Sequence, residues 1–314
     1  MSVRIGIGFG GRPFPDADPQ HLWRYVDACE ELDVDSLWLS DRIVSSTLNM
    51  EPIVALSFIA GRTKKLKVGT SVLAVPLRNP TILAKEIATL DFLSGGRSLP
   101  AIGLGTEDEK EYEACGTKRS VRVSRTEEAV EVMRLLWQED NVTYHGKHFT
   151  LNDVTIRPKP VFPPKGLPPI WIGGRSEAAM RRTARIGDGW LVSQATPAEV
   201  GEGVKKIKTW AEEYGNDIED DHYGALFAFC FADSREEAQR IAAPYMLRRR
   251  EDVDYNTFSA FGTPEDFIEL VDRFVEAGAD KFVVRPACPP EMMQEQLEIL
   301  GREIVPRYHP GDDS

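Results

Sequence analysis

Short apolar segments alternate with longer amphipathic segments along the whole chain. The short segments are bounded by Gly, Pro and polar residues, which is typical of strands buried in a parallel sheet. They predict strands at Val3–Phe9, Ser36–Leu39, Leu66–Leu73, Leu99–Leu104, Ile170–Ile172, Trp190–Ser193, Gly224–Phe231 and Lys281–Val284. The segments between them predict helices at Gln20–Leu32, Ile53–Arg62, Pro80–Phe92, Val123–Trp137, Ser176–Ile186, Pro197–Tyr214, Arg235–Leu247, Pro264–Ala277 and Glu291–Ile304. Strand–helix pairs repeated in this way predict an α/β fold, a (β/α)8 TIM barrel.

A doubly wound open sheet is the main alternative. Such a sheet needs fewer strands and usually carries a glycine fingerprint on its first turn. The segment Gly6–Gly11 resembles that fingerprint only loosely, because no clear helix start follows it. We therefore favour the barrel.

The composition fits one compact body. The chain has 314 residues, 42% of them hydrophobic, and no Pro/Gly/Ser-rich linker divides it. We predict a single domain over residues 1–308, followed by a short polar tail over 309–314. The net charge of −12 opposes binding to nucleic acid and to anionic membranes. The sequence shows no secretory leader and no run long enough to cross a bilayer, so we expect a cytoplasmic protein.

One region departs from the alternation. The sequence predicts a hairpin of residues 142–144 and 149–151, and a proline-rich segment follows it. Proline cannot donate a backbone hydrogen bond, so this segment forms neither a helix nor a central strand. We predict an insertion after strand four, an excursion at about residues 141–168 over the catalytic face, with His145 and His148 on the surface.

The segment Pro169–Glu177 joins a predicted strand to a predicted helix through two glycines. Gly173 and Gly174 allow the backbone to turn sharply and to approach a ligand closely. Ser176 stands at the N-cap position, and Glu177 complements the positive end of the helix dipole. These features together predict an anion site, typically for a phosphate. An ordinary strand-to-helix connection is the alternative that these residues leave open.

The residues that follow the predicted strands are mostly small. In a barrel the active site is built at the carboxyl ends of the strands. Here those ends carry Phe9–Gly11, Ser40–Arg42, Ser71–Val72, Gly103–Thr106, Gly173–Ser176, Ser193–Gln194, Asp233 and Arg285. They include no clustered metal-ligand set and no nucleophile elbow, and the cysteines lack CxxC spacing, so we predict no metal. Smooth walls, one phosphate site and few acid–base groups suit a cofactor that carries its own chemistry, a flavin or a deazaflavin.

A series of short motifs runs through the chain in order. The motifs are Leu37–Asp41, Val68–Leu73 with Pro76–Pro80, Ala88–Arg97, Gly103–Thr106 with Glu111–Tyr112, Tyr144–Lys147, Pro158–Pro160, Ile170–Ser176, Gly187–Trp190, Gly262–Glu265 and Ala277–Asp280. Each motif is weak alone, but the ordered set covers nearly the whole chain. By this set the chain resembles the bacterial luciferase-like monooxygenase family, and within it the branch of F420-dependent oxidoreductases.

The resemblance implies a barrel with an insertion after strand four, usually assembled as a homodimer. It implies a non-prolyl cis peptide bond between Ser71 and Val72, in a bulge that supports the central ring of the cofactor. We predict cofactor contacts from the residues that the resemblance implies and from their neighbours at the strand ends. They are Asp41, Ser71, Val72, Gly105, Thr106, Gly173, Gly174, Arg175, Ser176 and Ser193.

The sequence departs from the family pattern at Arg42. Related deazaflavin enzymes often carry a His at this position that can donate a proton, whereas an arginine stays protonated. A proton donor is therefore sought among the nearby carboxylates Asp41, Glu107, Asp108 and Glu111. We select Asp41, Asp108 and Glu111 as the catalytic candidates. We expect Arg42 to keep Asp41 ionised. For Glu111, a water-exposed carboxylate at a helix start is the alternative.

We predict an oxidoreductase that transfers a hydride between the deazaflavin coenzyme F420 and a small organic substrate. An FMN-dependent monooxygenase that uses oxygen is the alternative, because both cofactors present a phosphate. A third possibility is a barrel that binds a flavin or deazaflavin without turnover. F420 also has a polyanionic tail, for which Arg248–Arg250 is a candidate contact; a solvated helix face is the alternative for that run.

Overall fold

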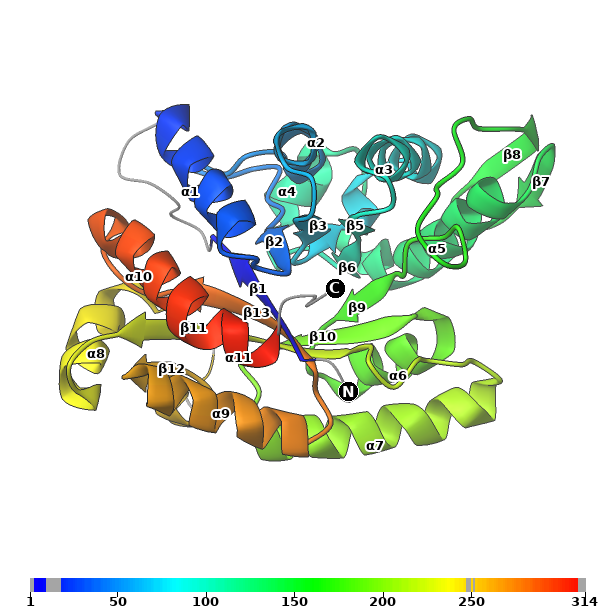
Figure 1. Cartoon of the computed structure of the whole chain (residues 1–314). Coiled ribbons are helices and arrows are strands. Elements are labelled where there is room, and N and C mark those ends of the chain that lie inside the picture. Colours follow the sequence, from blue (N-terminus) through cyan, green and yellow to red (C-terminus); the bar gives the residue numbers. More distant parts are fainter. Residues whose placement is uncertain (1–2, 10–17, 247–249, 251, 310–314) are drawn as a thin grey trace. The chain divides into compact units, whose positions relative to one another are not determined.

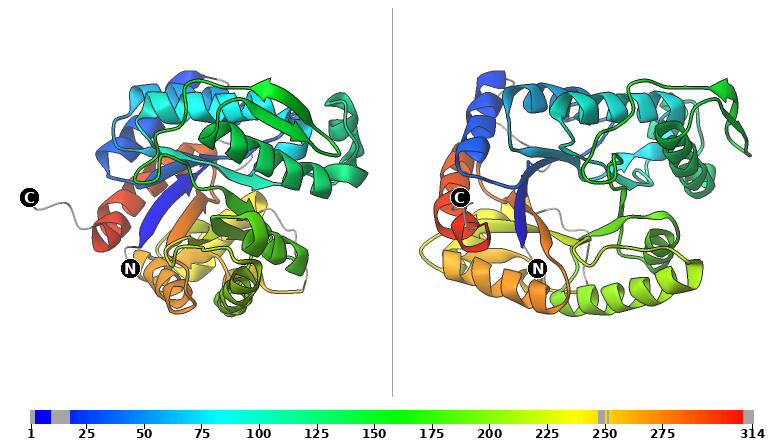
Figure 2. Two further views of the ribbon diagram at one scale, coloured as in Figure 1. Left: turned by 90° about the vertical axis from the view of Figure 1, so that its right-hand side faces the viewer. Right: turned by 45° about the vertical axis from the view of Figure 1, so that its right-hand side comes forward.

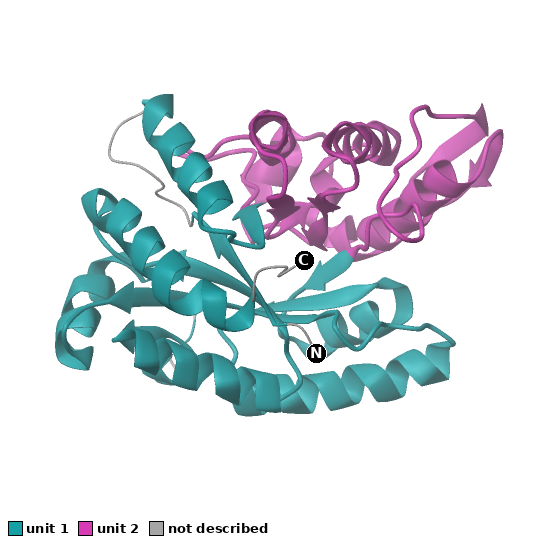
Figure 3. Ribbon diagram, in the orientation of Figure 1, with its two compact units in different colours: residues 1–38, 171–314 teal, residues 39–170 magenta. Residues whose placement is uncertain are grey.

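The computed structural model describes residues 3–9, 18–246, 250 and 252–309 (Figure 1). The chain divides into two compact units, and each is described by itself. Unit 1 comprises residues 1–38 and 171–314, and unit 2 comprises residues 39–170 (Figure 3). The single domain over residues 1–308 stays a prediction.

Unit 1 is built on a parallel sheet. Its strands are β1 (Arg4–Gly8), β2 (Ser36–Leu39, whose last residue falls in unit 2), β9 (Trp171–Gly173), β10 (Gly189–Ser193), β11 (Tyr223–Phe231), β12 (Ala260–Gly262) and β13 (Lys281–Pro286). Each strand pairs in parallel with its neighbour in the order β9, β10, β11, β13, β1, β2, and β12 adds to β11. The strands are apolar and buried almost throughout, as expected when helices cover a parallel sheet.

The helices of unit 1 begin where the sequence supplies caps. They are α1 (Pro19–Glu31), α6 (Glu177–Ile186), α7 (Pro197–Tyr214), α8 (Arg235–Ala242), α9 (Pro264–Glu276), α10 (Met293–Ile299) and α11 (Val305–Tyr308). The N-terminus of α7 shows the pattern most fully: Thr196 and Glu199 form a reciprocal capping box, and Pro197 occupies the first turn. Figure 2 shows α7 (yellow-green) and α9 (orange) lying along strands of unit 1.

Aromatic side chains join α9 to the sheet. Phe227 of β11 stacks on Phe274 of α9 with ring centroids 5.7 Å apart, and Phe229 meets Phe267 edge-on at 5.8 Å. Phe282 of β13 completes the group. Burying side chains of this size contributes roughly 2 kcal/mol each, so α9 is firmly attached to β11 and β13.

Unit 2 has short strands, long helices and a hairpin. The strands are β3 (Lys67–Thr70), β4 (Leu73–Ala74), β5 (Ser98–Leu99) and β6 (Ala101–Gly103), and the hairpin is β7 (Val142–His145) with β8 (Thr150–Val154). The helices are α2 (Pro52–Arg62), α3 (Pro80–Ser94), α4 (Glu109–Ala114) and α5 (Arg122–Gln138). β3 pairs with β5 and β4 with β6, both in parallel. In sequence order α2 packs on α3 and α3 on α5.

Two predicted strands of unit 2 are interrupted. The strand expected at Leu66–Leu73 breaks at Ser71 and Val72, where the peptide bond is cis, as the family resemblance implied. The strand expected at Leu99–Leu104 breaks at Pro100, which has no N–H to give to a neighbour. The strands therefore continue as β4 and β6 toward their carboxyl ends.

The predicted hairpin is confirmed, and it is held by α5. Glu128 of α5 accepts hydrogen bonds from the backbone of His148 (2.9 Å) and Phe149 (2.8 Å), and Glu131 accepts one from the Tyr144 hydroxyl (2.9 Å). The described contacts thus fix the hairpin to α5, and its expected position over the catalytic face stays a prediction. His145 is exposed, whereas His148 is half-buried.

Other differences lie at helix ends. The helix expected at Arg235–Leu247 ends as α8 at Ala242, followed by a 3-10 turn (Ala243–Tyr245), because Pro244 cannot continue it; Leu247 lies outside the described residues. The last helix runs on to Tyr308 through a π-helical segment (Leu300–Ile304). The sequence did not predict β12 or α4.

His309, the last residue that the structure describes, was expected in the polar tail but contacts β1. Its Nε2 accepts a 2.9 Å hydrogen bond from the backbone N–H of Ile5; residues 310–314 lie outside the described part. Among the helices that the structure describes, none has the length and apolar character needed to cross a membrane.

Candidate active site

Asp41 follows β2, and its side chain is fully enclosed. Its Oδ2 accepts a 2.9 Å hydrogen bond from the backbone N–H of Ala74, at the end of β4. The Nη2 of Arg78 lies 3.0 Å from both carboxylate oxygens, and its Nε lies 3.3 Å from Oδ2. Burial raises the pKa of Asp41, and Arg78 opposes that rise.

Arg78, and not Arg42, is therefore the cation beside Asp41. Arg42 is exposed, and the expectation that it keeps Asp41 ionised was wrong. The guanidinium of Arg78 also forms a 2.9 Å ion pair with Glu51, the N-cap residue of α2. Sequence reasoning missed Arg78 because it stands 37 positions after Asp41, inside a motif noted only for resemblance.

Glu111 connects two loops of unit 2. Its Oε1 accepts hydrogen bonds from the backbone N–H groups of Ile43 (2.8 Å) and Val44 (3.2 Å), and its Oε2 accepts one from the Thr106 hydroxyl (2.8 Å). Glu111 is 1% exposed. The alternative of a water-exposed helix-start carboxylate is therefore wrong, and the side chain braces the segment after β2 against the segment after β6.

The loop after β6 carries the remaining predicted residues of this unit. Gly105 has a φ of +81°, and a Cβ there would lie 2.8 Å from the Tyr112 hydroxyl, so only glycine fits. Asp108 is exposed and caps α4 by accepting a hydrogen bond from Lys110 N–H at 3.1 Å. Glu107 is exposed and pairs with Arg119 and Arg122, which hold its pKa below the usual range.

Ser71 and Val72 lie between β3 and β4, in the same unit as Asp41. The backbone N–H of Ser71 donates a 2.7 Å hydrogen bond to the carbonyl of Leu39. Val72 lies against Gly103, where an added Cβ would come within 2.5 Å of a Val72 methyl group. In unit 2 the structure thus gathers Asp41, Ser71, Val72, Gly105, Thr106 and Glu111 around neighbouring strand ends.

The predicted phosphate segment of unit 1 forms an open helix start. Ser176 is the N-cap of α6 and accepts a 3.2 Å hydrogen bond from Ala179 N–H. Gly174 has a φ of +125°, and its carbonyl accepts a 2.8 Å hydrogen bond from Trp190 Nε1. Residues 174–178 are exposed. The amino end of α6, with its dipole and unpaired N–H groups, can therefore receive an anion.

Two arginines meet at one carbonyl beside this helix start. The Nη1 of Arg175 and the Nη1 of Arg250 donate to the carbonyl oxygen of Gln194, at 2.8 and 3.0 Å. Gln194 follows Ser193, which is exposed at the carboxyl end of β10. The structure thus brings Arg175 close to the strand end that carries Ser193.

Arg250 is already engaged. Its side chain is 3% exposed and forms ion pairs with Glu199 (2.7 Å) and Asp252 (2.6 Å). The hydrogen bonds from Arg250 to Asp252 lower the pKa of that carboxyl group to about 2. Arg250 is therefore not free to bind a cofactor tail, and Arg248 and Arg249 lie outside the described residues.

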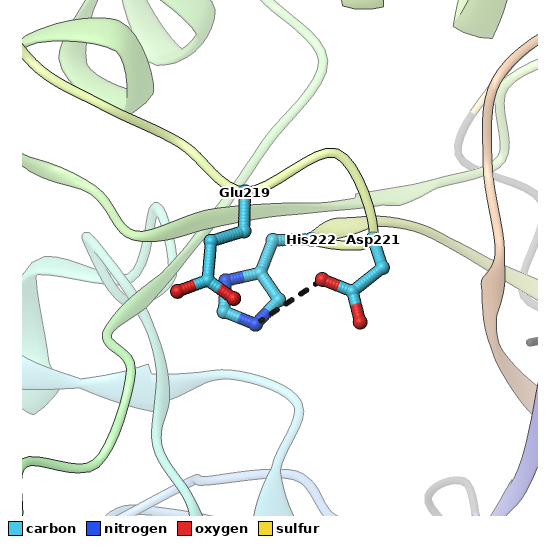
Figure 4. A group of neighbouring side chains, drawn as sticks. All are labelled: Glu219, Asp221 and His222. Atoms are coloured by element: carbon cyan, nitrogen blue, oxygen red, sulfur yellow. Dashed lines mark ion pairs between the residues drawn. The ribbon is translucent and has the colours of Figure 1, made fainter. Parts of the chain in front are cut away.

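A possible cation-binding group lies elsewhere in unit 1. Glu219, Asp221 and His222 precede β11 and bring one ligand atom each to within 4.8 Å of one another (Figure 4). His222 Nε2 lies 3.9 Å from Asp221, whose other oxygen pairs with Arg4. The group stands at the amino end of its strand, away from the carboxyl ends where barrel enzymes build their sites.

Residues 2–252 match the model of the family described as luciferase-like monooxygenase. The chain belongs to the luciferase-like monooxygenase family.

Similar proteins include a reductase and a monooxygenase. A 5,10-methylenetetrahydromethanopterin reductase of Archaeoglobus fulgidus is 25% identical over 346 residues, covering 97% of this chain and 99% of that protein. An FMNH2-dependent dimethylsulfone monooxygenase of Pseudomonas putida is 25% identical over 290 residues, covering 82% of this chain and 78% of that protein.

The solved structures agree on the fold. An F420-dependent secondary alcohol dehydrogenase, in complex with an F420–acetone adduct, matches with a TM-score of 0.79 at 23% identity. The match covers 97% of this chain and 98% of that chain. The (β/α)8 barrel class predicted from the alternation of strands and helices is confirmed.

Proposed function

We propose that this protein is an F420-dependent oxidoreductase that transfers a hydride to or from a small organic substrate. The observation that carries the proposal is the exposed amino end of α6 with Arg175 beside it, an anion site at the carboxyl end of β9. A relative whose name specifies F420 supports the choice of cofactor: an F420-dependent glucose-6-phosphate dehydrogenase of Segniliparus rotundus is 26% identical over 340 residues.

The proposed cofactor contacts are residues at or after the strand ends. Gly173, Gly174, Arg175 and Ser176 hold the phosphate, and Ser193 lies beside them. The contacts to the ring are Asp41, Ser71, Val72, Gly105 and Thr106. Bound reduced F420 supplies a hydride, and the protein supplies the position and the charge around the ring.

The proton for such a reaction is assigned to the carboxylates of unit 2. Asp41 has a raised pKa but is buried against Arg78, and Glu111 accepts hydrogen bonds on both oxygens. Asp108 alone of the three predicted catalytic residues is exposed to solvent. Substituting each in turn, as Asp41→Asn, Asp108→Asn and Glu111→Gln, tests the assignment at saturating cofactor.

An FMN-dependent oxygenase is the second candidate, favoured by the monooxygenase of Pseudomonas putida among the relatives. Titration of the purified protein with F420 and with FMN, followed by absorbance, separates the two. We expect tighter binding of F420 and no oxygen uptake with the reduced cofactor. Tighter binding of FMN together with oxygen consumption would replace the proposal by the oxygenase. Binding of either cofactor without turnover of any carbonyl, alcohol or imine substrate would favour the binding-only barrel.

We further propose that the protein is a homodimer through α2 and α3. Val54 and Phe58 of α2 are 58% and 66% exposed, and Ile82 and Leu93 of α3 are 60% and 76% exposed. Each pair lies on one face of its helix, by the helical repeat. Large apolar side chains gathered on adjacent helices are typical of an interface between copies. Sedimentation of the native chain should give a dimer, and Phe58→Glu with Leu93→Glu should give a monomer.

A further inference from the structure

Arg78 projects from a rigid corner of unit 2. The corner consists of a 3-10 turn (Val75–Leu77) and the start of α3, where Asn79 caps the helix and Pro80 occupies the first position. Asn79 accepts hydrogen bonds from the backbone N–H groups of the first turn. A proline on either side of Arg78 further limits the backbone, so the direction of the side chain is fixed by local structure.

The guanidinium of Arg78 faces two carboxylates from different segments. It contacts both oxygens of Asp41 at 3.0 Å and one oxygen of Glu51 at 2.9 Å. The Asp41 side chain is fully enclosed, and that of Arg78 is 13% exposed. Glu51 is in turn held by its capping bond to Val54 N–H at 2.7 Å. Such enclosed, charge-assisted contacts fix geometry more strongly than surface ion pairs do.

Carboxylates outnumber cations around this group. Besides Asp41 and Glu51, Glu86 of α3 interacts electrostatically with Arg78, and Cys115, which follows α4, interacts with Arg78, Asp41 and Glu111. Burial raises the pKa of both Asp41 and Glu86, and Arg78 opposes the rise in each. Arg125 of α5 reaches the corner as well, but its 3.0 Å bond goes to the carbonyl of Pro76 and not to a carboxylate.

We propose that Arg78 is a positioning residue of the active site, which fixes the orientation and the charge of Asp41 and links Asp41 through Glu51 to the start of α2. The inference rests on the proposed function only in that Asp41 lies beside the cofactor ring. Arg78 itself need not touch the cofactor. Its effect on binding is transmitted through Asp41.

The test is a double-mutant cycle on cofactor binding. F420 is titrated into the native protein, Arg78→Met, Asp41→Asn and the double variant. We expect Arg78→Met to weaken binding at least tenfold and to have less than a twofold further effect in the Asp41→Asn background, because the two residues act as one group. Equal, additive losses in both backgrounds would overturn the inference.

The pH dependence of binding gives a signature that a purely structural role does not produce. Arg78 opposes the effect of burial on the pKa of Asp41 more strongly than the Ala74 N–H does, so without Arg78 the carboxylate takes up a proton at higher pH. Cofactor affinity that depends on ionised Asp41 is lost as the pH falls. This loss should therefore begin at a higher pH in Arg78→Met than in the native protein. The Asp41→Asn variant should lack this change. Arg78→Lys keeps the positive charge but loses the forked donor geometry of the guanidinium. It should therefore restore the pH midpoint of cofactor binding and only part of the affinity.

Arg125→Met is the matched control, because Arg125 holds the same corner without contacting Asp41. It should leave the affinity and the pH midpoint unchanged; a loss equal to that of Arg78→Met would reduce Arg78 to a support of the fold. If Asp41→Asn leaves cofactor binding unchanged, the role of Asp41 in the proposed function fails. The coupling of Arg78 to Asp41 is then decided by the same cycle on the midpoint of urea unfolding, and additive shifts there would reject it.

Discussion

The carboxylate of Glu111 lies 2.8 Å from the backbone nitrogen of Ile43 and accepts its hydrogen bond. Through this bond and a second one to Thr106, the first helix after β6 holds the segment that follows Asp41. The two loops that border the predicted ring site of unit 2 are therefore one connected structure.

Replacing Glu111 distinguishes a brace from a proton donor. Glutamine can keep the bonds, since its oxygen can accept from the backbone and its amide can donate to Thr106. We expect Glu111→Gln to retain stability and cofactor affinity, and Glu111→Ala to lower the free energy of unfolding by about 1–3 kcal/mol. Urea unfolding and F420 titration measure both. Loss of turnover in Glu111→Gln with native stability and affinity would instead restore Glu111 as the proton donor.

The phosphate contacts of unit 1 should separate into a ligand and a cap. Arg175 is exposed, so Arg175→Ala should weaken cofactor binding by about 1–3 kcal/mol with no change in melting temperature. Ser176 also caps α6, so Ser176→Ala should weaken binding and cost about 1 kcal/mol of stability. Arg181→Ala, on the same helix but paired with Glu177, is the control. Native affinity in both site variants would place the phosphate elsewhere.

Gly103 should be required for the placement of Val72. A Cβ at position 103 would lie 2.5 Å from a methyl group of Val72, so Gly103→Ala must displace that side chain. Overpacking of this kind costs about 1–3 kcal/mol. We expect lower stability together with weaker cofactor binding. Gly61→Ala, where a Cβ meets nothing within 4 Å, is the control. Unchanged affinity in a folded Gly103→Ala protein would remove Val72 from the predicted ring contacts.

Asp280 should make the protein less stable at alkaline pH. Neither of its oxygens has a hydrogen-bond donor among the described residues, and burial, reinforced by Asp221, raises its pKa to about 7. In the unfolded chain the pKa of an aspartate is about 3.9. At pH values between these two pKa values, the folded state therefore keeps a proton on Asp280 that the unfolded chain has lost. The stability that this proton gives is complete below about pH 4 and is lost as the pH rises through 7.

Asp280→Asn should therefore raise the melting temperature at pH 8 by a few degrees and flatten its fall between pH 5 and pH 8. Asp220→Asn serves as the control, because Asp220 is exposed and its pKa is lowered by Lys208. An equal fall with pH in the native and Asp280→Asn proteins would show that Asp280 does not titrate in this range.

The sequence predicted what depends on neighbouring residues. Strand–helix alternation, proline in first turns and the serine N-cap of α6 are local features, because backbone geometry and hydrogen bonding act over a few positions. These features were sufficient for the (β/α)8 class and for the helix start that can receive a phosphate. The hairpin in the insertion followed from the same local patterns.

Only the tertiary structure decided which charged side chains meet. Asp41 was expected to pair with its neighbour Arg42, yet consecutive residues at a strand end point in different directions. The enclosed carboxylate of Asp41 instead pairs with Arg78, which stands 37 positions later and is brought to it by the turn before α3. Glu111 was buried for a similar reason, since backbone N–H groups of a distant loop needed an acceptor. Long polar side chains carry no periodic signal for their partners, and their burial depends on strands and helices that pack only after the chain has folded.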